Sequence, residues 1–309
     1  MKQALAAIGL AIALVIAGAA QAAPAFEDHY ANDAGVKIHY VAAGHGPLVV
    51  MIHGFPDYWG TWKPLMGELD DSYRVVAMDL RGHGDGIGVG SGFRLEDCAD
   101  DVAALAQVLG IAKFIAVGYS MGGMVAQLVA RRHAPMLSGL VLCATTRNVL
   151  GSPAEKLAAL ALPAAAVTAF WWNPLLQSFS AEILGMALLG PVDDPATARW
   201  ARAQLRRTPL RTALSAIQAV CQFTSHTWIG QVDVPAAVVV TTMDRIAPPG
   251  RQRKLARALP GASVYELDAD HAVCITAPQQ FAQVLLQACW SVVPDRRAQS
   301  PSAVASART

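Results

Sequence analysis

Residues 114–123 read Phe-Ile-Ala-Val-Gly-Tyr-Ser-Met-Gly-Gly, and this stretch decides the fold. The apolar run Phe114–Val117 predicts a buried β-strand, and the amphipathic pattern Ser120–Arg132 predicts a helix directly after it. The turn between them has the form G-x-S-x-G, with Gly118 and Gly122 on either side of Ser120. So sharp a turn needs small neighbours, because larger side chains would clash with the adjoining strand and helix. The strand–turn–helix context predicts that Ser120 is a nucleophile raised above the carboxyl edge of a sheet.

Outward from this turn, short apolar runs alternate with helical patterns over residues 36–147 and 231–293. The runs that we predict to be buried strands are Leu48–Ile52, Tyr73–Met78, Phe114–Val117, Leu140–Cys143, Ala236–Thr241 and Ser263–Leu267. Continuous apolar runs of strand length are typical of strands that are covered on both faces. We therefore predict an α/β fold, in which a mostly parallel central sheet is covered by helices on both faces. Val36–Val41 is predicted to start a leading antiparallel segment.

The strand pattern stops between residues 148 and 230 and resumes at Val234. This stretch is rich in Ala, Leu and Arg and is interrupted by prolines, so we predict a helical cap inserted into one domain. Trp171 and Trp172 lie in it and are predicted to contact an apolar substrate, although a helical cap also needs aromatic residues for its own core. Residues 294–309 are rich in Ser, Ala and Arg and are predicted to be a disordered tail.

A serine nucleophile needs a general base, and that base needs a third group to orient it. In this architecture the chain order is serine, acid, histidine. Asp244 follows the run Ala236–Thr241, and His271 follows the run Ser263–Leu267, so both are predicted on loops at the carboxyl ends of strands. We therefore predict a triad of Ser120, His271 and Asp244. The alternative for Asp244 is a helix N-cap, because a helical pattern follows it.

The loop after Leu48–Ile52 reads His53-Gly54-Phe55-Pro56. It is predicted to bring the backbone N–H of Phe55 beside that of Met121, which opens the helix after the nucleophile. Two such donors form an oxyanion hole for a tetrahedral intermediate. His53 itself is predicted to be structural.

With these motifs the chain resembles the α/β-hydrolase fold superfamily from Val36 to Val292. The motifs that carry the resemblance are HGFP at 53–56, DLRGHG at 79–84, GYSMGG at 118–123, the aspartate loop at Asp244 and DHAV at 270–273. HGFPDYW at 53–59 is similar to the epoxide-hydrolase and haloalkane-dehalogenase branch. That branch implies an aspartate nucleophile. It also implies cap tyrosines in the epoxide hydrolases and a halide-binding Trp directly after the nucleophile in the dehalogenases. This chain has Ser120 and Met121 at the two positions of the turn and no Tyr between residues 148 and 230, which favours acyl transfer to water.

We therefore predict a serine hydrolase that cleaves a small-to-medium, apolar carboxylic ester or lactone through an acyl-enzyme, without a metal or cofactor. A carbon–carbon bond hydrolase, a perhydrolase, a thioesterase and an acyltransferase remain open on the same triad. A non-catalytic ligand-binding protein of the same fold is disfavoured, because a binder has no need of all three groups.

The composition excludes several other classes. Lys and Arg number 24 against 23 Asp and Glu, which gives a net charge of +1 and no basic field to hold nucleic acid. The five cysteines show no paired CxxC or Cys/His spacing of a zinc site. A hydrophobic content of 54% is too high for a disordered chain.

The amino terminus has the pattern of a secretory signal. Lys2 precedes an uncharged run from Ala4 to Ala20, and the run ends in an A-x-A site at residues 20–22. We predict that residues 1–22 are removed from an exported, periplasmic or secreted protein that then has no stable membrane span. The alternative is an uncleaved membrane tether, because about 17 apolar residues approach the lower limit for a span.

Overall fold

The computed structural model of the chain describes residues 26–33, 36–89, 92–151, 199, 203 and 208–293. The predicted signal peptide, the predicted tail and most of the predicted cap, with Trp171 and Trp172, lie outside the described residues. Within the described ranges, no helix combines the length and the apolar character that crossing a membrane requires.

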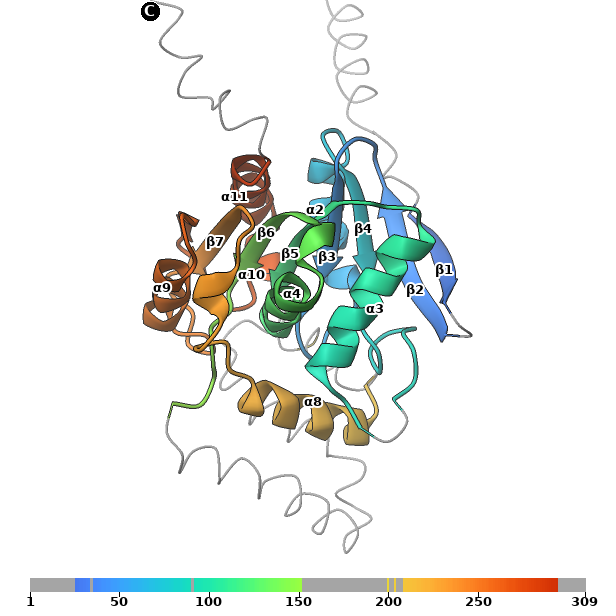
Figure 1. Ribbon diagram of the computed structural model, residues 1–309, viewed down its shortest axis with the longest axis horizontal. Coiled ribbons are helices and arrows are strands. Elements are labelled where there is room, and N and C mark those ends of the chain that lie inside the picture. Colours follow the sequence, from blue (N-terminus) through green and yellow to red (C-terminus); the bar gives the residue numbers. More distant parts are fainter. Residues whose placement is uncertain are drawn as a thin grey trace, which may run out of the picture.

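An eight-stranded sheet forms the centre of the molecule, in the order β1-β2-β4-β3-β5-β6-β7-β8 (Figure 1). The strands are β1 (Glu27–Asp33), β2 (Val36–Ala43), β3 (Leu48–Ile52), β4 (Arg74–Met78), β5 (Phe114–Tyr119), β6 (Leu137–Cys143), β7 (Ala236–Thr241) and β8 (Ser263–Leu267). β2 pairs antiparallel with β1 and with β4, whereas β3 to β8 pair with one another in parallel. The predicted mostly parallel sheet and its α/β fold class are confirmed. The parallel arrangement puts the ends of β3, β5, β6, β7 and β8 at one edge.

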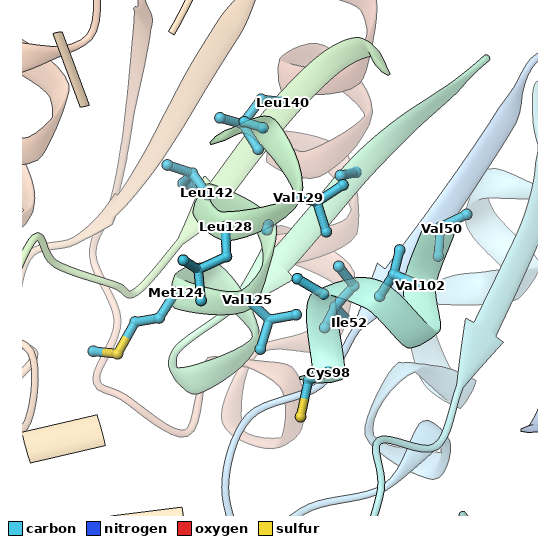
Figure 2. Packing of buried hydrophobic residues seen from close by; sticks show 14 of the residues in the cluster. Val50, Ile52, Cys98, Val102, Met124, Val125, Leu128, Val129, Leu140 and Leu142 are labelled. Atoms are coloured by element: carbon cyan, nitrogen blue, oxygen red, sulfur yellow. The ribbon is translucent and has the colours of Figure 1, made fainter. Parts of the chain in front are cut away.

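Helices cover both faces of the sheet, because successive strand residues point to opposite sides. The helices are α2 (Lys63–Leu69), α3 (Leu95–Val108), α4 (Met121–Arg132), α8 (Leu210–Gln222), α9 (Pro249–Ala258), α10 (Val273–Thr276) and α11 (Pro278–Ser291), with short 3-10 turns η1 (Trp59–Trp62), η2 (Ala134–Met136) and η3 (Ile229–Gln231). One core lies between the sheet and α3, α4 and α9, and the other lies between the sheet and α2 and α11. In Figure 2, Val102 of α3 and Val125 of α4 meet Val50 and Ile52 of β3 in the first core.

The two outer strands depart from the sequence prediction. β1 is not predicted, because its residues EDHYAND are mostly polar and Ala31 is the buried apolar position that it adds to the core. β8 has its predicted bounds, but it is an edge strand rather than one covered on both faces: Val264 is 48% exposed, and Glu266 pairs with Arg253 at 2.7 Å. An apolar run alone does not show which strand is last in the sheet.

α8 lies in the region predicted as an insertion, and it sits at the end of the sheet where β3 and β4 finish (Figure 1). Just before α8, Thr208 Oγ1 donates to Pro56 O, which follows β3, at 3.5 Å. The side chain of Thr212 lies against Gly82, which follows β4. The chain that leaves β6 meets the chain that follows α8 through a bridge between Asn148 and Thr224. Both ends of the predicted insertion therefore meet beside the sheet.

All five cysteines lie within the described ranges and are free thiols. Cys98, Cys143 and Cys289 are buried, in keeping with the apolar segments that contain them. Burial raises the pKa of the Cys289 thiol to about 12 and that of Cys98 and Cys143 well above the ordinary value. These thiols are packing residues rather than nucleophiles.

Truncation of α3 on its inner and outer faces tests this packing. Val102 is fully buried, whereas Val108 of the same helix is 44% exposed. Val102→Ala should lower the free energy of unfolding by about 2 kcal/mol, through lost burial and the remaining cavity. Val108→Ala should change it by less than about 0.5 kcal/mol. Urea unfolding followed by Trp fluorescence measures both, and equal losses would contradict the assignment of the inner face.

Candidate active site

Ser120 occupies a strained turn between β5 and α4. Its φ is 54° and its ψ is −116°, a conformation that residues with a side chain rarely adopt. Hydrogen bonds fix both sides of this residue. Its N–H donates to Cys143 O at 3.0 Å, and its carbonyl accepts from Thr145 Oγ1 at 2.8 Å and from the N–H of Gly123 at 3.0 Å. The end of β6 thus holds the turn at the end of β5.

The glycines around the turn are needed for the close packing that the sequence motif implies. A Cβ at Gly118 would overlap the backbone of Gly122, and a Cβ at Gly122 would overlap the carbonyl oxygen of Ile52. At Gly123, a Cβ would strike the side chain of Thr145. α4 can therefore begin directly against the ends of β3 and β6 only because these positions lack side chains.

The structure brings together the three residues predicted as a triad. His271 Nε2 lies 2.9 Å from Ser120 Oγ, and His271 Nδ1 lies 2.7 Å from Asp244 Oδ2. Ser120 follows β5, Asp244 follows β7 and His271 follows β8, so the shared carboxyl edge of these strands explains how residues 151 positions apart meet. The ring of His271 also packs against Tyr119, with the ring centroids 5.6 Å apart.

The carboxylate of Asp244 is buried and accepts hydrogen bonds on both oxygens. Its Oδ1 accepts the N–H groups of Ile246 and Ala247 at 2.9 and 2.8 Å. Its Oδ2 accepts from His271, from Thr241 Oγ1 at 2.8 Å and from Gln252 Nε2 at 3.2 Å. The alternative of a helix N-cap is not what the structure shows, since the N-cap of α9 is Pro248 and has no side-chain cap. One oxygen of Asp244 orders its own loop and the other faces the imidazole.

Phe55 and Met121, predicted as oxyanion donors, lie on segments that meet at Ser120. Met121 is the first residue of α4, and Gly54, next to Phe55, packs against the nucleophile: a Cβ there would come 3.1 Å from Ser120 Cβ. The hydrogen bonds between described residues use neither the N–H of Phe55 nor that of Met121. The role of these two N–H groups as oxyanion donors stays a prediction.

His53 ties the Phe55 loop to the chain that follows β4. Its Nδ1–H donates to Gly54 O at 2.7 Å, which leaves Nε2 to accept the N–H of Leu80 at 3.0 Å. Burial lowers the pKa of His53, so the ring stays neutral and keeps both bonds. The structural role predicted for His53 agrees with this geometry. His83 is also buried, and burial together with the neighbouring His53 lowers its pKa to about 3.

Within the described part of the chain, one group of side chains has the arrangement of metal ligands, namely His39, Asp79 and Asp85. Its central carboxylate already accepts three hydrogen bonds. Asp79 Oδ2 accepts from His39 Nδ1 at 2.8 Å and from the N–H of Asp85 at 2.9 Å, and Oδ1 accepts the N–H of Trp59 at 2.7 Å. Burial alone would raise the pKa of Asp79, but the bond from His39 and the other donors hold it below its ordinary value. We interpret this group as an internal ion pair that orders the loops near β4.

Three residues that contact the triad are not predicted from the sequence. Thr145 supports the Ser120 carbonyl, and Thr241 and Gln252 bind the Asp244 carboxylate. A hydroxyl residue at the end of a strand beside the nucleophile strand is a signal that could have indicated Thr145. Gln252 lies in a strongly charged helix, where the pattern indicates a solvent-facing residue.

Comparisons with known proteins agree with this fold. A family model described as alpha/beta hydrolase fold matches residues 47–278. Epoxide hydrolase 4 of Mus musculus is 37% identical over 115 residues, which cover 36% of this chain and 32% of that protein. The pimeloyl-[acyl-carrier protein] methyl ester esterase of Chromobacterium violaceum is 28% identical over 250 residues, covering 79% of this chain and 94% of that protein. The chain thus spans about a third of the epoxide hydrolase but nearly all of the esterase.

Among solved structures, the enol-lactonase from Burkholderia xenovorans LB400 superimposes with a TM-score of 0.73 at 27% sequence identity. The superposition covers 84% of this chain and 99% of that chain. A thermophilic esterase from Thermogutta terrifontis gives the same TM-score at 24% identity, which shows a shared fold.

Asp57, two residues beyond Phe55, gives a pH test of this site. It is 4% exposed, and its carboxyl group contacts Thr61 Oγ1 and the N–H of Tyr58. Burial raises the pKa of Asp57 to about 8, and the negative charge of Asp79 adds to the effect. Between the ordinary carboxyl pKa and about 8, the folded protein holds a proton that the unfolded chain has lost. Stability should therefore fall as pH rises through this window.

Asp57→Asn keeps the shape of the side chain and removes its titration. The variant should become more stable relative to wild type as pH rises from about 5 to about 8, by about 1 kcal/mol or more, or at least 2–4 °C in Tm. Asp233→Asn, at an exposed position, is the control and should show no such trend. Thermal melts across this range measure the difference, and parallel curves for wild type and Asp57→Asn would contradict a neutral buried Asp57.

Proposed function

The chain belongs to the α/β-hydrolase fold family, and from that premise we propose that it is a serine hydrolase that cleaves a carboxylic ester or lactone through an acyl-enzyme. The observation that carries the proposal is the continuous hydrogen-bonded line from Ser120 Oγ through His271 to Asp244, with distances of 2.9 and 2.7 Å. The strained backbone of Ser120 supports it, because it holds the hydroxyl clear of the sheet edge.

In the first half-reaction, Ser120 Oγ attacks the substrate carbonyl while its proton passes to His271 Nε2. The new C–O bond converts the carbonyl into a tetrahedral oxyanion, which accepts hydrogen bonds from the N–H groups of Phe55 and Met121. Asp244 holds the imidazole in position and stabilises its positive charge. The oxyanion then collapses, the alkoxide leaves with the proton from His271, and the acyl group stays on Ser120.

In the second half-reaction, water takes the place of the alcohol. His271 removes a proton from the water, the resulting hydroxide attacks the acyl carbonyl, and the same donors hold the second oxyanion. Collapse releases the carboxylic acid and returns the proton to Ser120. Side chains, two backbone N–H groups and water suffice for the whole cycle, so the proposal includes no metal or cofactor.

The nucleophile argues against an epoxide as the substrate. A serine that opened an epoxide would form an ether, and an ether has no carbonyl that water can attack, so turnover would stop. A serine ester regenerates the enzyme by acyl transfer to water. The similarity to the methyl ester esterase and to the enol-lactonase, each over more than three quarters of this chain, supports an ester or lactone. The similarity to epoxide hydrolase 4 covers little more than a third of it.

Replacement of the nucleophile tests the proposal. Ser120→Ala should abolish labelling by a fluorophosphonate probe and lower kcat by roughly 10⁴- to 10⁶-fold on the best substrate of a panel. The panel contains nitrophenyl esters of increasing chain length, a lactone series and an aryl epoxide. Ser263→Ala, on the edge strand β8, is the matched control and should keep both labelling and turnover. Wild type that neither labels nor cleaves any ester or lactone would overturn the proposal.

A further inference from the structure

The side chain of Gln252 is fully buried, although it lies on the charged helix α9. All of its polar atoms have partners. Its Oε1 accepts the N–H of Thr241 at 3.1 Å, and its Nε2 lies 2.6 Å from Ala247 O, 2.9 Å from Thr241 Oγ1 and 3.2 Å from Asp244 Oδ2. An amide buried in this way connects the end of β7, the acid loop and α9.

The backbone determines which way this amide points. On one side it faces an N–H, that of Thr241, which can only donate, and on the other it faces the carbonyl of Ala247, which can only accept. An amide turned by 180° would set N–H against N–H and oxygen against oxygen. One hydrogen of the Gln252 NH₂ group therefore goes to Ala247 O, and the other is shared between Thr241 Oγ1 and Asp244 Oδ2.

The orientation of Gln252 then fixes the orientation of the Thr241 hydroxyl. Because Thr241 Oγ1 accepts from Gln252, its own proton is directed to its other partner, Asp244 Oδ2, at 2.8 Å. Asp244 thus meets donors at every contact, two from backbone N–H groups and three from His271, Thr241 and Gln252. A carboxylate surrounded only by donors is held as an acceptor, which is the form that orients the imidazole.

We propose that Gln252 is a positioning residue of the triad, which sets the direction of the Thr241 hydroxyl and thereby holds Asp244 as an acceptor for His271. The proposal rests on the function proposed above. Gln252 acts through Asp244 and touches neither the substrate nor the reacting atoms. The free energy of a hydrogen bond from a neutral donor to a charged group typically corresponds to a change in rate of about 10- to 100-fold.

Kinetics of Gln252→Met, which keeps the length and burial of the side chain, test the proposal. On the best ester or lactone, kcat should fall by about 10- to 100-fold with little change in KM, because the substrate does not touch this residue. The acid limb of the kcat/KM profile should move to higher pH, because the carboxylate that loses donors interacts more strongly with the imidazolium.

Thr241→Val tests whether Gln252 acts through the hydroxyl. If the two form one network, the double variant Gln252→Met/Thr241→Val should lose little more activity than the worse of the single variants. The matched control is Gln127→Met, because Gln127 is an equally buried glutamine that bonds instead to Ser225 Oγ and Thr146 O. It should lose stability without a shift of the acid limb.

A measurement without substrate separates this proposal from the proposed function. In ¹⁵N-histidine-labelled protein, the proton of His271 Nδ1 should give a far-downfield resonance, and Gln252→Met should move it whereas Gln127→Met should not. Wild type without ester or lactone turnover would overturn the proposed function and leave this measurement to decide the role of Gln252. A folded Gln252→Met variant with the wild-type resonance, or with the wild-type pH profile in an active enzyme, would overturn the positioning role.

Discussion

The backbone of Ser120, held at a φ of 54°, is the constraint on which the rest of the structure depends. A residue in so sparsely populated a conformation costs about 1–3 kcal/mol, and the surrounding structure must hold it there. Cys143 and Thr145, at the end of β6, bind its N–H and carbonyl, and glycines let α4 approach the ends of β3 and β6. The turn thus fixes the mutual positions of three strands and one helix. The hydroxyl that it exposes stands where the loops of the remaining strands converge.

Three buried carboxylates near this edge differ in the donors that they receive. Asp79 meets His39 and two backbone N–H groups, and its pKa lies below the ordinary value. Asp57 accepts from Thr61 Oγ1 and from the N–H of Tyr58 among the described residues, and burial raises its pKa to about 8. Asp244 accepts five hydrogen bonds. The same side chain therefore serves as an internal anion, a neutral packing group or an orienting acceptor, according to the donors that the fold supplies.

The sequence predicts the parts of this molecule that carry a local pattern. Buried strands are continuous apolar runs, so β3, β7 and β8 have their predicted bounds, and the motif around Ser120 contains its own structural requirements. The place of a strand in the order of the sheet leaves no such local pattern in the sequence. The polar strand β1 is missed, and the edge location of β8 depends on strand order, which tertiary packing decides. Gln252 is missed for the same reason: residues 249–258 read PGRQRKLARA, and nothing in that pattern marks one polar residue as buried.

Adjacent residues of α9 connect the predicted cap to the triad. Neighbouring helical side chains point in different directions, so Gln252 reaches Asp244 while Arg251 binds the carbonyls of Asn148 and Val149, where the predicted insertion begins. The chain that follows α8 is held by α4, the helix that starts at the nucleophile, because Ser225 Oγ donates to Gln127 Oε1. The residues that lead into and out of the insertion are thus bound to the two helices that support the acid and the nucleophile. These connecting residues and the triad share the two helices α4 and α9. The geometry of the connecting residues and that of the triad therefore depend on the same packing.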